Sequence, residues 1–204
     1  MEGVARVRRT RWLSPKTFAL ELSRPVGFRF QPGQSILVRR AGLERSYSIA
    51  SGPDEDGLLL CIRCVPGGAM SPALSRLLPG DELAVEGPQG YFLLQTGPRP
   101  VVFVATGTGV APFLSMTRAG ARGFTFLHGV SRREDLHFNE EMRAAAGCAV
   151  PCVSPVRVTD WAAGHLAPGR YDFYLCGNRE MIRDFTLLVD ERFAGSRVVT
   201  EVFH

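Results

Sequence analysis

Residues 101–112 read VVFVATGTGVAP. Val101–Ala105 is a continuous apolar run, which is typical of a strand buried on both faces. The turn Thr106-Gly107-Thr108-Gly109-Val110-Ala111-Pro112 follows it and opens a helix over about 111–119. Glycines there let the backbone approach a ligand closely, and the free N–H groups at the start of the helix favour a pyrophosphate. A plain glycine turn is the alternative interpretation, because the spacing differs from the usual GxGxxG.

The same alternation of strand and helix continues to the C-terminus. Apolar runs predict strands at Thr125–Leu127, Ala149–Val153, Asp172–Leu175 and Arg197–Phe203. Patterns of helical period predict helices at about Asp135–Ala145 and at Arg179–Phe193, with a shorter unit around Thr159–Leu166. Alternating strands and helices indicate an α/β fold with a doubly wound parallel sheet.

Residues 1–95 follow a different pattern, in which short alternating runs are cut by Pro and Gly. Six runs predict strands, at Val4–Trp12, Thr17–Leu22, Ser35–Arg39, Tyr47–Ala50, Leu58–Val65 and Glu82–Glu86. Such a set indicates a small six-stranded antiparallel barrel, with a short helix over Pro72–Leu77. The stretch 95–100, QTGPRP, is the best linker candidate. We therefore expect a β-barrel domain over residues 1–95 and an α/β domain over residues 96–204.

Two stretches in the first half have the composition of phosphate-binding sites. Gly67-Gly68-Ala69-Met70-Ser71 follows a predicted strand and precedes a short helix, so it is a second candidate phosphate cradle. In Arg45-Ser46-Tyr47-Ser48, Arg45 and Tyr47 share one face of a strand, and the two serines share the other. A cation beside an aromatic ring can hold a phosphate and lie against a flat ring. The alternatives are an ordinary turn, and an exposed Arg next to a half-buried Tyr.

The composition disfavours several classes of protein. Of the 204 residues, 45% are apolar and 22% are charged, which is ordinary for a soluble globular protein. The formal charge of +4 comes almost wholly from scattered arginines, since Lys16 is the only lysine, so a nucleic-acid role receives little support. Residues 1–12 lack the apolar segment of a signal peptide, and no stretch approaches the roughly 20 apolar residues of a membrane span. Five cysteines fit free thiols in a reducing cytoplasm, and we expect the protein there.

In combination, the motifs are specific. The chain resembles the ferredoxin–NADP⁺ reductase superfamily, and its bacterial oxygenase reductases, along essentially its full length. The resemblance lies in seven pieces that occur in family order: Phe30-Gln31-Pro32-Gly33-Gln34, Arg45-Ser46-Tyr47-Ser48-Ile49-Ala50-Ser51, Gly67-Gly68-Ala69-Met70-Ser71, Gly87-Pro88-Gln89-Gly90, Thr106–Pro112, Cys176-Gly177-Asn178 and Glu201-Val202-Phe203.

The resemblance implies a flavin-binding barrel followed by an NAD(P)-binding domain. In the barrel, Arg45 and the turn from Gly67 to Ser71 would contact the flavin phosphates, with Ser46, Gly68 and Met70 as further cofactor-binding residues. Tyr47 would pack on the isoalloxazine, and Ser48 would lie near N5, the atom that receives hydride. The segment 87–90 would shape the flavin side of the barrel. The flavin is expected to be FAD, with FMN as the alternative.

In the second domain, the resemblance implies that the loop Thr106–Pro112 takes the pyrophosphate of NADH or NADPH. The residues expected to contact the dinucleotide are Thr106, Gly107, Thr108, Gly109, Pro112, Arg132, Cys176, Gly177 and Phe203. Cys176 would line the nicotinamide pocket, and Glu201 and Phe203 would be the C-terminal acid and the aromatic that covers the ring. Ser48, Cys176 and Glu201 are then the candidate catalytic residues. The chain has Phe203 where plant-type members have Tyr, and it continues to His204.

Other reactive side chains have weaker claims. Cys61-Ile62-Arg63-Cys64 resembles half a metal site, but residues i and i+3 of a strand face opposite sides and no second pair follows, so we expect packing thiols and no metal. His128 ends a predicted strand near the cofactor edge, where a structural histidine is the alternative. Arg132 and Arg133 could bind a 2′-phosphate, whereas Asp135 would oppose it or cap a helix. A solvated loop is the alternative there, so the choice between NADH and NADPH stays open.

These observations predict an NAD(P)H-dependent flavin oxidoreductase that passes electrons from the dinucleotide, through FAD, to a separate acceptor. The acceptor would be a ferredoxin-like electron-acceptor protein or a small oxidant, with neither nucleic acid nor membrane as partner. The two ligands would meet in the cleft between the domains. One alternative is an electron-transfer subunit of a larger flavoenzyme complex. A basic nucleic-acid-binding module is another, although it leaves both phosphate turns unexplained. The acceptor and the oligomeric state stay open.

Overall fold

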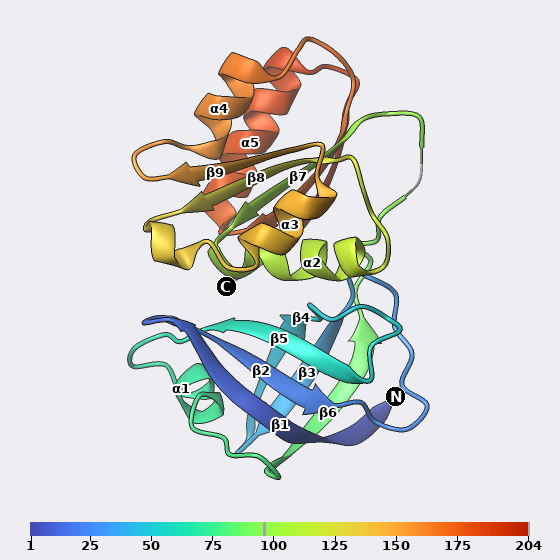
Figure 1. Cartoon of the computed structure of the whole chain (residues 1–204), viewed down its shortest axis with the longest axis vertical. Helices are drawn as coiled ribbons and strands as arrows, with labels where there is room; N and C mark the ends of the chain where they lie inside the picture. The colour runs from blue at the N-terminus through green and yellow to red at the C-terminus, as the bar shows by residue number, and fades with distance from the viewer. Residues whose placement is uncertain (96, 204) are drawn as a thin grey trace. The chain divides into compact units, whose positions relative to one another are not determined.

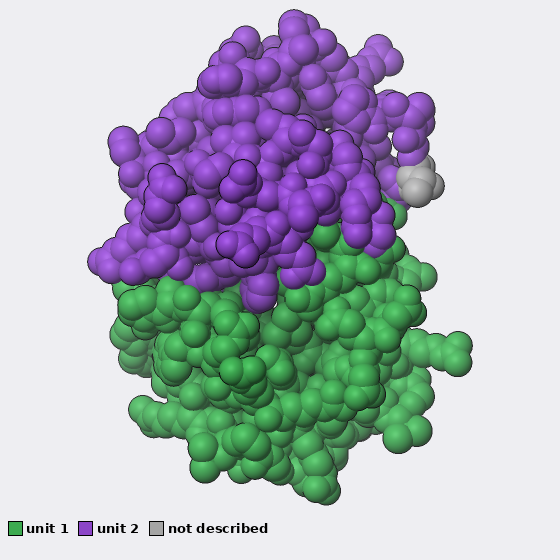
Figure 2. All heavy atoms as spheres, in the orientation of Figure 1, with its two compact units in different colours: residues 1–94, 111–119 green, residues 95–110, 120–204 purple. Residues whose placement is uncertain are grey.

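The computed structural model describes residues 1–95 and 97–203; Thr96, in the expected linker, and His204 lie outside the described residues. The chain divides into two compact units, coloured separately in Figure 2. Unit 1 comprises Met1–Leu94 and Ala111–Ala119, and unit 2 comprises Gln95–Val110 and the residues from Gly120 onward.

Unit 1 contains the predicted six-stranded antiparallel sheet, within the residues that the structure describes. Its strands are β1 (Glu2–Ser14), β2 (Thr17–Ser23), β3 (Ser35–Arg40), β4 (Leu43–Ser48), β5 (Gly57–Arg63) and β6 (Glu82–Gln89), in the order β4-β3-β6-β1-β2-β5 (Figure 1). A bridge between Ile49 and Leu60 connects the chain after β4 to β5, so the two ends of the sheet meet and form a barrel. Inward residues such as Val7 and Leu20 fill the barrel, while Arg6 and Arg8 alternate outward.

Several element boundaries in unit 1 differ from the prediction, among them those of β4 and of the short helix. Strand β4 begins at Leu43 instead of Tyr47, because Ala41 and Gly42 form a two-residue hairpin turn with φ values of 50° and 76°. Helix α1 spans Met70–Leu74 instead of Pro72–Leu77. It begins early because the Ser71 hydroxyl accepts a 3.0 Å hydrogen bond from the Val65 amide and closes the preceding turn.

Helix α2 (Ala111–Arg118) packs within unit 1. The Ser115 hydroxyl donates a buried 2.7 Å hydrogen bond to the carbonyl of Ser51, and Arg118 lies 3.2 Å from the Glu55 carboxylate. The strand–helix alternation of the sequence predicts that this helix belongs to the second domain. The structure instead groups it with unit 1, in a different unit from β7, the strand (Val101–Thr106) that precedes it.

Unit 2 contains the predicted parallel sheet. Its strands are β7 (Val101–Thr106), β8 (Thr125–Val130), β9 (Cys148–Val153), β10 (Asp172–Gly177) and β11 (Arg197–Val202), in the order β11-β10-β7-β8-β9 among the described residues. Helices α4 (Val158–His165) and α5 (Arg179–Arg192) cover one face of the sheet, and α3 (Asn139–Ala145) lies on the other (Figure 1). Side chains of β7 and β10 such as Val104 and Leu175 pack against Phe185 of α5, so the central strands are buried as their apolar runs predict.

The predicted helix Asp135–Ala145 is wrong in its first half. A 3-10 turn, η2 (Arg133–Asp135), is separated from α3 by three residues, and Phe138 has a left-handed φ of 57°. His137 in this break is 5% exposed. Burial of this side chain by tertiary packing overrides the local helical pattern, and Asp135 does not cap the helix.

Two further observations concern the predicted absences. No helix among residues 1–95 and 97–203 combines the length and apolar character of a membrane span. In the same residues, no three His, Cys, Asp or Glu side chains are grouped so that they could hold a metal ion. Cys61 is buried, which raises the pKa of its thiol to about 12, and Cys64 packs against the barrel core.

Candidate functional site

The carboxyl edge of the unit 2 sheet collects most of the residues predicted to bind the dinucleotide. The chain passes from β7 to β8 and β9 on one side, and then returns to β10 on the other side of β7. Ligands of open α/β sheets bind at such a point, where the strand order reverses. A 3-10 turn, η1 (Gly107–Val110), follows β7, and β10 ends at Gly177 and is followed by Asn178.

The glycines of η1 have two different roles. Gly107 has a φ of +52°, and a Cβ placed on it would have no atom within 4 Å, so the space above it is open to a ligand. Gly109 is buried, and a Cβ there would lie 2.2 Å from the carbonyl oxygen of Cys176. Only glycine therefore lets the loop pack directly on the end of β10.

Three residues fasten the two segments together. The Thr106 hydroxyl accepts a 3.0 Å hydrogen bond from the amide of Asn178, and a Cβ on Gly177 would come within 2.0 Å of that hydroxyl oxygen. The Asn178 side chain accepts a 2.8 Å hydrogen bond from the Met181 amide and caps α5. The site prediction omits Asn178, although Asn directly before an amphipathic helix is a recognisable capping signal.

The predicted C-terminal residues lie beside this edge. Cys176 and Glu201 occupy paired positions of β10 and β11, and the Cys176 Sγ lies 3.9 Å from Oε2 of Glu201. The Phe203 amide donates a 2.8 Å hydrogen bond to the carbonyl of Gly177. Burial, together with the Glu201 carboxylate, raises the pKa of the Cys176 thiol well above its usual value. Cys176 is therefore a neutral thiol that can line a pocket, not a thiolate nucleophile.

His128, at the end of β8, contacts the glycine loop. Its Nε2 lies 2.9 Å from the carbonyl oxygen of Gly107, and its side chain is fully buried. Burial lowers the pKa of His128 to about 4, so the ring is neutral near pH 7. Because a carbonyl only accepts, Nε2 carries the hydrogen and donates it. The site prediction did not include this residue.

The arginines predicted near the ribose are in the loop after β8. Arg132 is exposed and forms a 3.3 Å ion pair with Glu134. Arg133 is exposed at the start of η2. Arg132 thus lies in a loop at the same carboxyl edge of the sheet, but its positive charge is partly compensated by Glu134.

Unit 1 brings the two candidate flavin-binding stretches together. Leu43 and Tyr47 pack against the barrel core, and Arg45 lies between them on the same face of β4, exposed to solvent. Helix α1 packs on β4, which places the turn Gly67–Ser71 beside this strand. Burial raises the pKa of Tyr47 to about 12, so its phenol stays neutral. The other face of β4 carries exposed Ser46 and buried Ser48.

The turn after β5 exposes backbone groups, rather than side chains, to a potential ligand. Gly67 has a φ of +75°, a Cβ placed on it would have no atom within 4 Å, and Gly68 is also exposed. The Met70 side chain is buried in the barrel core, and the Ser71 hydroxyl already accepts the Val65 amide. Met70 therefore faces any ligand through its amide alone.

Pro112, another residue predicted to contact the dinucleotide, is the second residue of α2. It is buried and belongs to unit 1.

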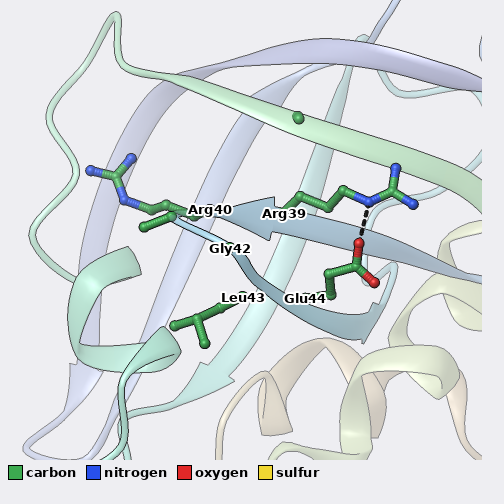
Figure 3. A pocket seen from close by; sticks show the side chains of 7 residues that line it. Arg39, Arg40, Gly42, Leu43 and Glu44 are labelled. Carbon is green, nitrogen blue, oxygen red and sulfur yellow. Dashed lines mark hydrogen bonds and ion pairs between the residues drawn. The ribbon is translucent and has the colours of Figure 1, made fainter.

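A hollow of about 370 Å³ lies at the β3–β4 hairpin, lined by Arg39 to Glu44 and Ala84. Arg39 and Glu44 point toward each other there, whereas Arg40 points the other way (Figure 3). Arg39 is paired with Glu44 at 2.6 Å, with Glu2 at 2.9 Å and with Glu86. Its charge is already compensated, so we assign no ligand to this hollow.

The candidate binding residues of the two units fit two phosphate-bearing ligands, one in each unit. Unit 1 offers an exposed guanidinium beside a half-buried aromatic ring and an open glycine turn. Unit 2 offers a glycine loop at the point where the strand order reverses, beside a buried neutral thiol. Open space at Gly67 and Gly107, where a side chain would stand, matches a backbone that approaches a ligand.

Comparison with known protein families assigns one domain to each half of the chain. Residues 8–93 match the family model of the oxidoreductase FAD-binding domain, and residues 103–186 match that of the oxidoreductase NAD-binding domain. The chain thus has a FAD-binding and an NAD-binding domain, as predicted.

Two curated relatives illustrate the similarity. The chain is 40% identical over 155 residues to ferredoxin–NADP reductase B of Sorangium cellulosum, covering 70% of this chain and 64% of that protein. It is 29% identical over 202 residues to the toluate 1,2-dioxygenase electron transfer component of Pseudomonas putida, covering 87% and 60%. The chain therefore spans less than two thirds of the length of these relatives.

Two solved structures have the same fold. The Amycolatopsis cytochrome P450 reductase GcoB superposes with a TM-score of 0.85 at 26% identity, covering all of this chain and 70% of that one. A ferredoxin NADP⁺ reductase from Neisseria gonorrhoeae, with bound FAD and NADP, superposes with a TM-score of 0.85 at 24% identity and covers 98% of both chains.

Proposed function

Because the chain belongs to the ferredoxin–NADP⁺ reductase superfamily, we propose that it is an NAD(P)H-dependent flavin oxidoreductase. It passes electrons from a reduced nicotinamide dinucleotide, through FAD, to a separate acceptor. The relatives include a ferredoxin–NADP reductase and an electron transfer component of a dioxygenase, so we propose a ferredoxin-like redox protein as the acceptor. A flavin accepts a hydride and releases its electrons singly, which suits such a partner.

The observation that supports the proposal most directly is the glycine loop at the reversal point of the unit 2 sheet. Thr106, Gly107 and Gly109 follow β7 there, and Cys176 and Gly177 end the neighbouring strand β10. The loop amides would hold the pyrophosphate of the dinucleotide, and Cys176 would line the nicotinamide side with a neutral thiol. Glu201, beside Cys176, is the candidate acid of this pocket.

In unit 1, Arg45 and the turn Gly67–Ser71 would hold the flavin phosphates, Tyr47 would support the ring system, and Ser48 would lie near its reacting nitrogen. Tyr47 suits this role because its phenol is neutral and its ring is fixed by packing against the barrel core. Hydride transfer requires that the nicotinamide and flavin rings lie face to face with water excluded.

The test is anaerobic reduction of the protein loaded with FAD. NADH and NADPH are mixed with it in parallel, bleaching of the flavin absorption is followed by stopped flow, and an iron–sulfur ferredoxin is then added as oxidant. We expect rapid bleaching by at least one dinucleotide and return of the colour with the ferredoxin. A chain that retains no FAD after reconstitution, or bound FAD that neither dinucleotide bleaches, would overturn the proposal.

A further inference from the structure

His128 is a buried polar side chain at a position where core packing alone would not require one. It is 0% exposed and packs beside Phe126, with ring centroids 5.4 Å apart. Its Nδ1 has no hydrogen-bond partner among the described residues. A buried nitrogen without a partner costs stability, so an apolar side chain would suit the packing better. The other ring nitrogen makes a hydrogen bond that offsets part of this cost.

That contact is directed at the glycine loop. His128 is paired in register with Ala105 on β7, so the two side chains lie on the same side of the sheet. The imidazole reaches past Ala105 to the residue that follows the end of β7. Nε2 therefore lies 2.9 Å from the carbonyl oxygen of Gly107, the first residue of η1.

We propose that His128 is a positioning residue for the dinucleotide: its Nε2–H, bonded to the Gly107 carbonyl, fixes the loop 106–109 in the conformation that presents its amides to the pyrophosphate. The inference rests on the proposed function, because it takes this loop as the dinucleotide site. Gly107 has a φ of +52° and no neighbouring atom within 4 Å of a Cβ, so packing does not hold its open side. Gly109 is held from the other side by β10, and the two contacts fix both ends of the turn.

The experiment compares three variants of the full chain loaded with FAD. His128→Leu keeps the volume and removes the donor, whereas His128→Gln keeps an amide N–H near the position of Nε2. Cys152→Ala is the matched control, because Cys152 is also buried, at 1% exposed, but lies on β9, two strands away from β7, and packs in the core on the face of the sheet opposite His128. Each variant is measured for FAD content, for KM and kcat with the preferred dinucleotide, and for NAD(P)⁺ affinity by calorimetry.

We expect His128→Leu to raise KM and the Kd for NAD(P)⁺ by about 5- to 10-fold, the effect of one lost hydrogen bond. FAD content and kcat should stay within about twofold, and Gln should restore most of the affinity. The inference is overturned if Leu leaves both constants unchanged, if Gln gives no recovery, or if Cys152→Ala weakens dinucleotide binding as much as Leu does.

Failure of the proposed function is distinguishable from failure of this inference. If the chain with its native His128 bound no dinucleotide, the proposed function would fail, and hydrogen exchange at the amides 107–110 would still test the contact. Exchange should be faster in the Leu variant than in the native chain and the Gln variant, and equal rates in all three would refute the positioning role.

Discussion

The backbone of Gly109 lies against Cys176 so closely that a Cβ at position 109 would stand 2.2 Å from the Cys176 carbonyl oxygen and 2.7 Å from its carbonyl carbon. Both residues are buried. The two atoms that such a Cβ would meet belong to the Cys176 backbone, so no flexible side chain can move aside. The loop 106–109 and the end of β10 are thus packed directly against each other.

Gly109→Ala should therefore displace the loop. We expect a loss of stability of about 1–3 kcal/mol or more from overpacking, and an increase in the dinucleotide KM of at least about tenfold. Thermal unfolding and steady-state kinetics measure the two effects. Gly164→Ala is the control, because no atom lies within 4 Å of a Cβ at this position of α4, and it should stabilise the helix by up to about 1 kcal/mol. Normal kinetics in Gly109→Ala would contradict the assignment of the loop.

Arg45→Ala tests the flavin site in unit 1. Arg45 is exposed and donates a 2.7 Å hydrogen bond to the carbonyl of the adjacent Glu44, so its loss should leave the barrel stable. If it holds a phosphate, the FAD Kd should rise about 10- to 100-fold, because a hydrogen bond to a charged group contributes about 1.5–3 kcal/mol. Fluorescence titration of the apoprotein with FAD measures this. Arg9→Ala, an exposed arginine on β1, should leave the affinity unchanged; an equal loss in both variants would indicate a general effect of charge.

Cys176→Ala separates hydride transfer from flavin binding. Cys176 belongs to unit 2 and is a neutral buried thiol, so its removal should leave the FAD content unchanged. If the thiol lines the nicotinamide pocket, its loss should slow anaerobic flavin reduction by about 10-fold or more through imperfect positioning. Stopped-flow absorption gives the rate. An unchanged reduction rate at saturating dinucleotide would remove Cys176 from the site.

The sequence identifies the sheet centre and the loops well, because their signals are local. The run Val101–Ala105 is apolar throughout since β7 is covered on both faces. Of the glycines after it, Gly107 has a left-handed φ of +52°, which favours glycine, and Gly109 leaves no room for a Cβ. The start of β4 was not predicted because its hairpin turn is Ala41-Gly42, which lacks the Asn-Gly or Asp-Gly signal of a type I′ turn.

Other features depend on contacts between distant segments. The bond between His128 and Gly107 joins residues 21 positions apart, and it exists only because β7 and β8 are parallel in one register. The break at Phe138 follows from the burial of His137, which a helical period does not reveal. The packing of α2 within unit 1 is likewise tertiary, since the sequence shows only that a helix follows a strand.

Arg197 supports a buried carboxylate at the opposite edge of the unit 2 sheet. Its guanidinium lies 2.9 Å from Asp172, which is 4% exposed, and also bonds the Tyr174 hydroxyl and the Gln95 side chain. Arg197→Ala should lower the free energy of unfolding by about 2–3 kcal/mol, somewhat less than for a fully buried pair, because Arg99 remains 3.7 Å from Asp172. Urea unfolding measures it. Adding Asp172→Asn should recover part of the loss, whereas Arg183→Ala, at an exposed ion pair, should cost at most about 1 kcal/mol.

The pH dependence of stability follows from the two buried histidines. Burial lowers the pKa of His128 to about 4 and also lowers the pKa of His137, while the nearby Asp135 carboxylate opposes both shifts. In the unfolded chain an imidazole takes up a proton near pH 6.5. Between about pH 6.5 and pH 4 the unfolded chain therefore binds more protons than the folded one, and stability falls as the pH falls.

We expect the free energy of unfolding to be constant with respect to these groups above about pH 6.5, and His128 alone to remove about 3 kcal/mol by pH 4. Urea unfolding at about pH 8, 6, 5 and 4.5 gives the profile, and its steepest part should precede the acid loss from carboxylates such as Asp184, whose pKa is lowered by Arg157 and Arg183. His128→Gln cannot take up this proton, so its profile should be flatter between pH 6.5 and 4.5 than that of the native chain. Parallel profiles for the two proteins would mean that His128 is not held as a neutral buried imidazole.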